Sequence, residues 1–168
     1  MGGQAIFTTN PTRLSLFGPV KELVIFRDDI VGRLRRTAIT FPPPRKPQPE
    51  PSSSTMDLDP PIPPPTQTQT PITLPRILTK TLLDQSHLSP FPLSTRPILW
   101  DHAGSLSLYP LPSALILADG ETEPFSVTYE GCCVVNPGAV LGQEGRRVAR
   151  WCEFDVMSQR GVGRDVGF

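Results

Sequence analysis

The chain has 168 residues, of which 22 are prolines, 19% are charged and 7% are aromatic. Sixteen basic residues balance sixteen acidic ones, so neither a uniformly basic nucleic-acid coat nor an acidic tail fits the composition. The longest apolar run, 114–118, has five residues, whereas a transmembrane helix needs roughly 20, and we expect no membrane span.

The first predicted elements precede residue 42. Residues 5–8 form a short β-favouring run, and residues 23–26 form a continuous apolar run that is typical of a buried strand. A helix follows over 28–38, because carboxylates favour a helix start and cations favour its end. This helix carries an apolar stripe of Ile30, Val31, Leu34 and Ala38.

Three basic residues lie close together in the second half of this helix: Arg33, Arg35 and Arg36. Such a cluster could contact phosphate. It could equally form a solvated helix face that complements the macrodipole, and we favour this second interpretation.

Thirteen of the 22 prolines lie within residues 42–75, among Ser, Thr, Gln and Asp and without any aromatic residue. This composition cannot bury enough apolar surface to offset the entropy of ordering, and it predicts a disordered or polyproline II insertion. The stretch contains P-x-x-P matches, which are typical of ligands for aromatic-lined grooves. Proline-rich tracts match this pattern by chance, and we favour a tolerated loop insertion.

Beyond the insertion, Pro75 suits the first turn of a helix over 75–85, with leucines 78, 82 and 83 facing inward. Strand signals then follow at 106–109, 114–118, 132–135 and 148–156. Cys132 and Cys133 share one of these strands, so their side chains should face opposite sides as buried thiols. The glycine-containing tail after residue 158 is expected to be loose.

Few residues could form an active site. The two histidines, His87 and His102, have no metal-ligand spacing, and neither a G-x-S-x-G elbow nor a Walker A loop occurs. Three carboxylates alternate directly after the run 114–118, namely Asp119, Glu121 and Glu123. They could hold a hard cation, but a solvated turn is the interpretation we favour. The residues alone predict no self-sufficient active site.

Several short segments, in a fixed order, point to a known family: IFTTNPTR (6–13), VIFRDD (24–29), SHLSPFPL (86–93), PILW (97–100), LYPLP (108–112), LILAD (115–119), PF (124–125), CVVNPG (133–138) and the terminal GF. Through these segments the chain resembles the B-subunit family of DNA polymerase epsilon. The similarity extends over 1–41 and 76–168 and corresponds to the C-terminal end of those proteins.

The resemblance implies an α+β fold, namely part of a calcineurin-like phosphoesterase domain, which is an αββα sandwich that accompanies an OB-fold in these proteins. Residues 1–41 and 76–168 would then be two segments of that domain, separated by the insertion 42–75. Because the similarity begins partway through the domain, the chain is expected to be a fragment or a truncated gene model.

Some relatives are active metallo-nucleases, and the resemblance maps their metal motifs onto this chain. His87 in His-Leu-Ser-Pro keeps one motif histidine, whereas Asp119 and Glu121 stand where a Gly-His-x-His motif has its two histidines. Carboxylates in place of imidazoles suit harder ions than transition metals. The positions His87, Asp119 and Glu121 therefore predict a degenerate metal site in a catalytically inactivated domain, with neither a metal nor a cofactor.

The resemblance implies a non-catalytic accessory subunit in the nucleus. It would scaffold the C-terminal region of the polymerase catalytic subunit, join other replisome subunits and contact DNA indirectly or weakly. One alternative is a metal-dependent phosphoesterase or nuclease, and another is a fragment without independent function. The segment around Trp100 and Tyr109 is a candidate contact surface, but burial in the core is the fate we expect for both residues.

Overall fold

The computed structural model describes residues 5–38, 74–141 and 148–167. The strands are β1 (Thr12–Leu16), β2 (Lys21–Phe26), β3 (Ala114–Leu117), β4 (Phe125–Tyr129), β5 (Cys132–Asn136), β6 (Val148–Asp155) and β7 (Arg160–Gly167), and the helices are α1 (Ile30–Thr37) and α2 (Leu74–Asp84). The predicted insertion 42–75 lies outside the described residues, except that Leu74 and Pro75 begin α2.

A five-stranded sheet with the order β1-β2-β3-β5-β4 forms the centre of the structure. β2, β3 and β5 are parallel, and β1 and β4 are antiparallel edge strands. The three apolar runs predicted as buried strands are β2, β3 and β5. Their sequences are continuously apolar because parallel strands are covered on both faces. Leu23 pairs with Ala114 across β2 and β3, so the segments on either side of the insertion share one sheet.

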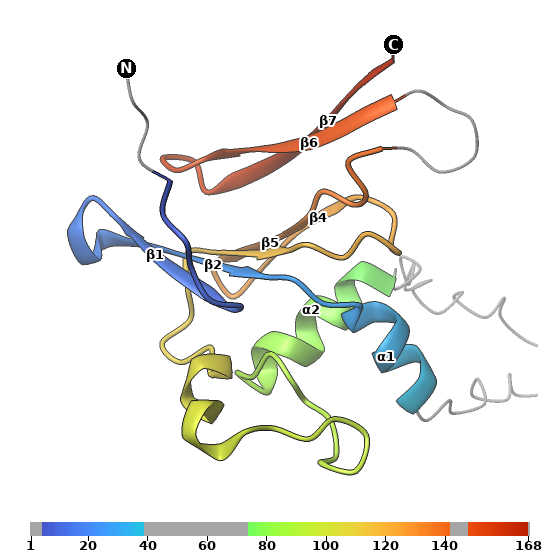
Figure 1. Ribbon diagram of the computed structural model, residues 1–168. Helices are drawn as coiled ribbons and strands as arrows, with labels where there is room; N and C mark the ends of the chain where they lie inside the picture. The colour runs from blue at the N-terminus through green and yellow to red at the C-terminus, as the bar shows by residue number, and fades with distance from the viewer. Residues whose placement is uncertain (1–4, 39–73, 142–147, 168) are drawn as a thin grey trace, which may run out of the picture.

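The sheet is covered on both faces (Figure 1). α1 and α2 lie against one face, and the β6–β7 hairpin lies over the other. Cys132 belongs to the core cluster on the helix side and Cys133 to the cluster under the hairpin, which confirms that their side chains face opposite sides. No described helix is long and apolar enough to cross a bilayer.

Both predicted helices are confirmed. α1 begins directly after Asp29, which caps it by accepting a hydrogen bond from the backbone N–H of Gly32 at 3.1 Å. Ala38 lies beyond the last helical residue in extended conformation and is exposed, so it is not part of the apolar stripe. α2 buries the three leucines that were predicted to face inward.

The strand predictions at 5–8 and 106–109 were wrong. Residues 5–8 are not a strand, and β1 begins at Thr12. A 3-10 helix over Trp100–Leu106 takes the place of the later strand and leaves only an isolated bridge between His87 and Ser107.

Besides β1, two further strands were not predicted, β4 and β7. β4 and β5 are joined by a two-residue turn in which Glu130 and Gly131 both have positive φ, 49° and 77°, the geometry that matches the twist of a hairpin. The tail after residue 158 forms β7, which pairs with β6 along its whole length, so the expectation of a loose tail was wrong. Pairing with a neighbouring strand here overrides the low strand propensity of glycine.

Trp100 and Tyr109 are not core residues. Their exposed fractions are 76% and 80%, so the expectation that both are buried was wrong. Leu108, next to Tyr109, is fully buried instead. Leu108 therefore packs this part of the chain into the core, and the side chains of Trp100 and Tyr109 remain on the surface.

Candidate functional site

The carboxyl ends of β2, β3 and β5 meet at one edge of the sheet, because the three strands are parallel neighbours. In open sheets with parallel strands this edge is where ligands bind. The polar residues placed there are Asp28 and Asp29 after β2, Asp119 after β3, and Asn136 at the end of β5. We call these four residues the carboxyl-edge cluster.

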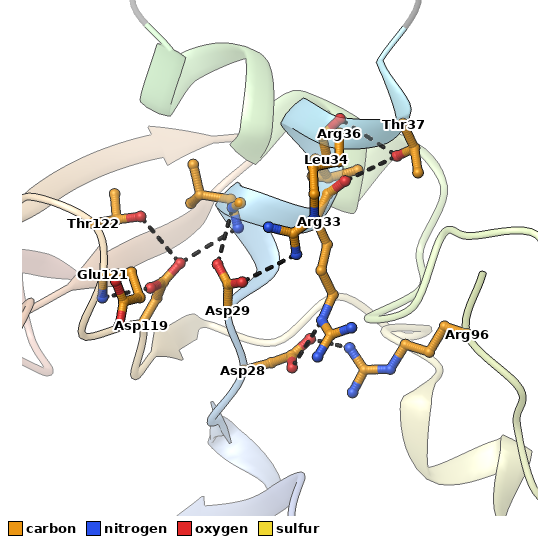
Figure 2. Close-up of polar contacts among 12 residues, drawn as sticks. Asp28, Asp29, Arg33, Leu34, Arg36, Thr37, Arg96, Asp119, Glu121 and Thr122 are labelled. Atoms are coloured by element: carbon orange, nitrogen blue, oxygen red, sulfur yellow. Dashed lines mark hydrogen bonds and ion pairs between the residues drawn. The ribbon is translucent and has the colours of Figure 1, made fainter.

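Asp119 is the most buried carboxylate of this cluster, with an exposed fraction of 1%. Its Oδ1 accepts a hydrogen bond from the backbone N–H of Glu121 at 2.9 Å. Its Oδ2 accepts one from the Thr122 hydroxyl at 3.1 Å and one from the backbone N–H of Val31, in α1, at 3.4 Å (Figure 2). Protein donors therefore occupy both oxygens, and the interpretation of a solvated turn at Asp119 was wrong.

Asn136 holds the loop after β3 from the other side. Its Oδ1 accepts hydrogen bonds from the backbone N–H of Asp119 at 3.1 Å and of Gly138 at 3.3 Å. Its Nδ2 donates to the backbone carbonyls of Asp119 at 3.1 Å and of Thr122 at 3.3 Å. All of these partners are protein groups, so the amide connects the ends of β3 and β5 instead of facing a ligand.

The two carboxylates after β2 are also paired. The Oδ2 of Asp29 lies 3.2 Å from a guanidinium nitrogen of Arg36. Asp28 lies between Arg33, whose Nε is 3.4 Å from Oδ1, and Arg96, which donates to Oδ2 (Figure 2). The Arg96 guanidinium also stacks over the Phe26 ring, 5.9 Å from its centroid. These ion pairs tie α1 to the segment that follows α2.

The three arginines considered as a possible phosphate contact therefore differ in environment. Arg33 and Arg36 face carboxylates, whereas Arg35 is exposed and has no ion pair within the described residues. Arg35 and Arg36 line an open hollow of about 340 Å³ together with Glu121. A hollow bordered by cations and carboxylates together has no strong preference for an anion.

The three predicted metal-site positions do not form one site. His87 follows α2, and its Nδ1 accepts a hydrogen bond from the backbone N–H of Ser89 at 3.0 Å. Asp119 is surrounded by protein donors and Glu121 is exposed. Within residues 5–38, 74–141 and 148–167, no three His, Cys, Asp or Glu side chains lie close enough to hold a metal ion.

The thiols are in apolar surroundings. Burial raises the pKa of Cys132 to about 12, and it also raises the pKa of the half-buried Cys152. A thiol with a raised pKa is a poor nucleophile at neutral pH, because the thiolate is the reactive form. These two cysteines therefore contribute packing to the fold.

Sequence reasoning missed Asn136 and Arg96 as members of this edge. Asn136 does have a local signal, since it is the polar end of an otherwise apolar strand. Arg96 has none, because it reaches Asp28 from 68 residues further along the chain.

Comparisons with known proteins agree in the family they indicate. The model of a family described as the B subunit of DNA polymerase alpha/epsilon matches residues 3–127. A protein of Schizosaccharomyces pombe, named as the B subunit of DNA polymerase epsilon, is 43% identical over 136 residues, which are 81% of this chain and 21% of that protein.

Two further relatives match in the same way. The Saccharomyces cerevisiae protein of the same name is 35% identical over an alignment 169 positions long, which covers 96% of this chain and 24% of the length of that protein. DNA polymerase epsilon subunit 2 of Mus musculus is 33% identical over 135 residues, which cover 80% of this chain and 20% of the length of the mouse protein. The chain thus spans about a fifth to a quarter of the length of these curated relatives.

Proposed function

The chain belongs to the B-subunit family of DNA polymerases alpha and epsilon, and from that premise we propose that it acts in a non-catalytic accessory subunit of a DNA polymerase epsilon complex. Its role is to bind and stabilise the C-terminal region of the catalytic subunit and to join other replisome subunits in the nucleus. Contact with DNA is indirect or weak, in keeping with the even balance of basic and acidic residues.

The layer order supports a partial calcineurin-like sandwich as the finer description of the fold. A helix layer, the five-stranded sheet and the β6–β7 hairpin follow one another (Figure 1). This is three of the four layers of an αββα sandwich. We accordingly treat residues 1–41 and 76–168 as two segments of one domain, separated by the insertion 42–75.

The observation that carries the non-catalytic role is the environment of Asp119. Its carboxylate accepts three hydrogen bonds from protein donors in a buried position. These bonds use three of the roughly four lone-pair positions of the carboxylate, which leaves it little capacity to bind a cation. We propose that His87, Asp119 and Glu121 are remnants of a metal site whose most buried member now caps α1. Of the three arginines considered for contact with phosphate, we propose only Arg35. Arg33 and Arg36 already face Asp28 and Asp29.

Co-purification tests this role. The tagged chain is co-expressed with the C-terminal region of a DNA polymerase epsilon catalytic subunit, with the full-length S. pombe relative as the positive control. We expect both the chain and the control to co-elute with that region in size-exclusion chromatography. Co-elution of the control without the chain would reject the scaffolding role for this part of the protein.

A phosphodiester hydrolysis assay with Mn²⁺ separates the scaffold from the enzyme alternative. We expect the chain and its His87→Ala variant to give the same background rate. Turnover by the chain that His87→Ala abolishes would instead support a metal-dependent phosphoesterase.

A further inference from the structure

An open groove of about 840 Å³ lies between α2 and β4, away from the carboxyl-edge cluster. Residues of α2, including Arg76, Ile77 and Lys80, form one wall, and residues 126–129 of β4 form the other. β4 is the last strand of the five-stranded sheet, and β5 is its only strand partner in the described residues.

The outer edge of β4 can accept another strand. Alternate residues of an edge strand present backbone N–H and C=O groups that lack a partner. The strand reads FSVTY and has neither the charged side chains nor the prolines that commonly block pairing at an edge. Its register with β5 runs from Phe125–Asn136 to Tyr129–Cys132 without a bulge. Five residues at about 3.4 Å each give an edge of roughly 17 Å.

Polar contacts connect the two walls of the groove. The Tyr129 hydroxyl donates to Asp84 Oδ1 at 2.8 Å and accepts from Lys80 Nζ at 2.9 Å. Lys80 Nζ also lies 2.7 Å from Asp84 Oδ2 and 5.2 Å from the centroid of the Tyr129 ring. These contacts join the side chains of α2 to the face of β4.

The groove combines apolar and cationic surface. Ile77, with an exposed fraction of 50%, and the half-buried Val127 supply apolar contacts. Asp84 neutralises Lys80, whereas Arg76, one turn earlier on α2, is exposed and forms no ion pair within the described residues. The remaining charge of the groove is therefore positive and complements a carboxylate.

We propose that this groove binds an extended, acidic segment of a partner protein, which adds as a strand to β4 and places a carboxylate against Arg76. Strand addition beside a helix is an established mode of peptide recognition, in which main-chain hydrogen bonds give affinity and side-chain contacts give specificity. A proline-rich ligand would fit less well, because proline lacks the N–H that an edge carbonyl needs. Peptide binding by this groove does not depend on the polymerase role.

Selection from a phage-displayed library of random twelve-residue peptides on the 168-residue chain tests the proposal. We expect selected peptides to alternate apolar and polar residues and to contain Asp or Glu. When they are added as synthetic peptides to the ¹⁵N-labelled chain, the amide signals of 125–129 and 76–85 should shift most. N-methylation of alternate peptide amides should weaken binding at least tenfold, because it removes main-chain donors and retains the side chains.

Charge reversal tests the acidic character of the ligand. Arg76→Glu should weaken binding about five-fold, as expected for the loss of an exposed ion pair and its replacement by repulsion. The matched control is Arg27→Glu, an exposed arginine directly after β2 that does not line the groove, and this variant should change binding less than two-fold. Circular dichroism of both variants checks that they remain folded.

Three results would overturn the proposal. The selection could yield no peptide that shifts the signals of β4, or the N-methylated peptide could bind as tightly as the unmodified one. The chain alone could also form a dimer in light scattering with the β4 amides already protected from exchange. That last result would assign the edge to a second copy of the chain.

Discussion

At the residue scale, Asp119 connects parts of the chain that are far apart in sequence. It receives hydrogen bonds from its own loop and from α1, 88 residues away. In Asp119→Asn an N–H donor replaces one acceptor, and one of the negative charges near the start of α1 is lost. We expect the free energy of unfolding to fall by about 2 kcal/mol, measured by urea denaturation at pH 7.

The matched control for Asp119→Asn is Glu121→Gln, two residues later. The Glu121 side chain is exposed and makes no hydrogen bond or ion pair within the described residues. Glu121→Gln should change the free energy of unfolding by less than about 0.5 kcal/mol. Equal effects of the two substitutions would contradict the capping role of Asp119.

The buried thiol of Cys132 gives stability a pH dependence. Burial raises its pKa to about 12, whereas the unfolded chain releases this proton near pH 8.5. The native state therefore binds more protons between these values, and stability must fall as the pH rises through that window. The effect of this one group is at most about 1.4 kcal/mol per pH unit.

Urea denaturation at pH 8 and pH 10.5 measures this dependence, with Cys132→Ala as the reference. The free energy of unfolding should fall more steeply in the unsubstituted chain than in the variant, although the variant is less stable at pH 8 because it leaves a cavity. Parallel pH dependences in the two proteins would show that Cys132 ionises in the native state.

At the element scale, the sequence predicts the three strands that are buried on both faces, and it also predicts β6 from its alternating pattern. The runs at 23–26, 114–118 and 132–135 are continuous because both faces of a parallel strand are covered. β7 was missed because its glycine-rich sequence becomes a strand only through pairing with β6. The burial of Asp119 was missed for a similar reason. It depends on the packing of α1 against the loop after β3, a contact between residues 88 positions apart that local sequence does not encode.

Close packing of the hairpin against the sheet depends on Gly161 in β7. A Cβ atom at this position would lie 2.4 Å from Cγ2 of Val135, a buried β-branched side chain with little freedom to move. Gly161→Ala should lower stability by about 1–3 kcal/mol, visible as a lower melting temperature. At Gly163 nothing lies within 4 Å of the same atom, and Gly163→Ala should leave the melting temperature nearly unchanged. Equal losses at both positions would contradict the close approach.

At the scale of the whole molecule, the hairpin and the sheet share a core and should unfold together. Cys152 and Phe154 of β6 pack against Leu23, Cys133 and Val135 on the sheet face opposite the helices. Removing residues 142–168 would expose this face to water, at a cost of about 1.5–3 kcal/mol for each large apolar side chain. We expect the shortened chain to bind the dye ANS and to lose its sharp thermal transition, while the full chain melts in one step.

A substitution on the outer face of the same hairpin separates loss of the shared core from a general effect of altering the hairpin. Val166 has an exposed fraction of 51%, so Val166→Ser should leave the single transition and the low dye binding unchanged. Phe154→Ser removes a side chain from the shared core and should increase dye binding towards that of the shortened chain. Two separate transitions in the full chain would mean that the hairpin is an independent unit. The β6–β7 hairpin would then not stabilise the five-stranded sheet, which carries the groove and the carboxyl-edge cluster.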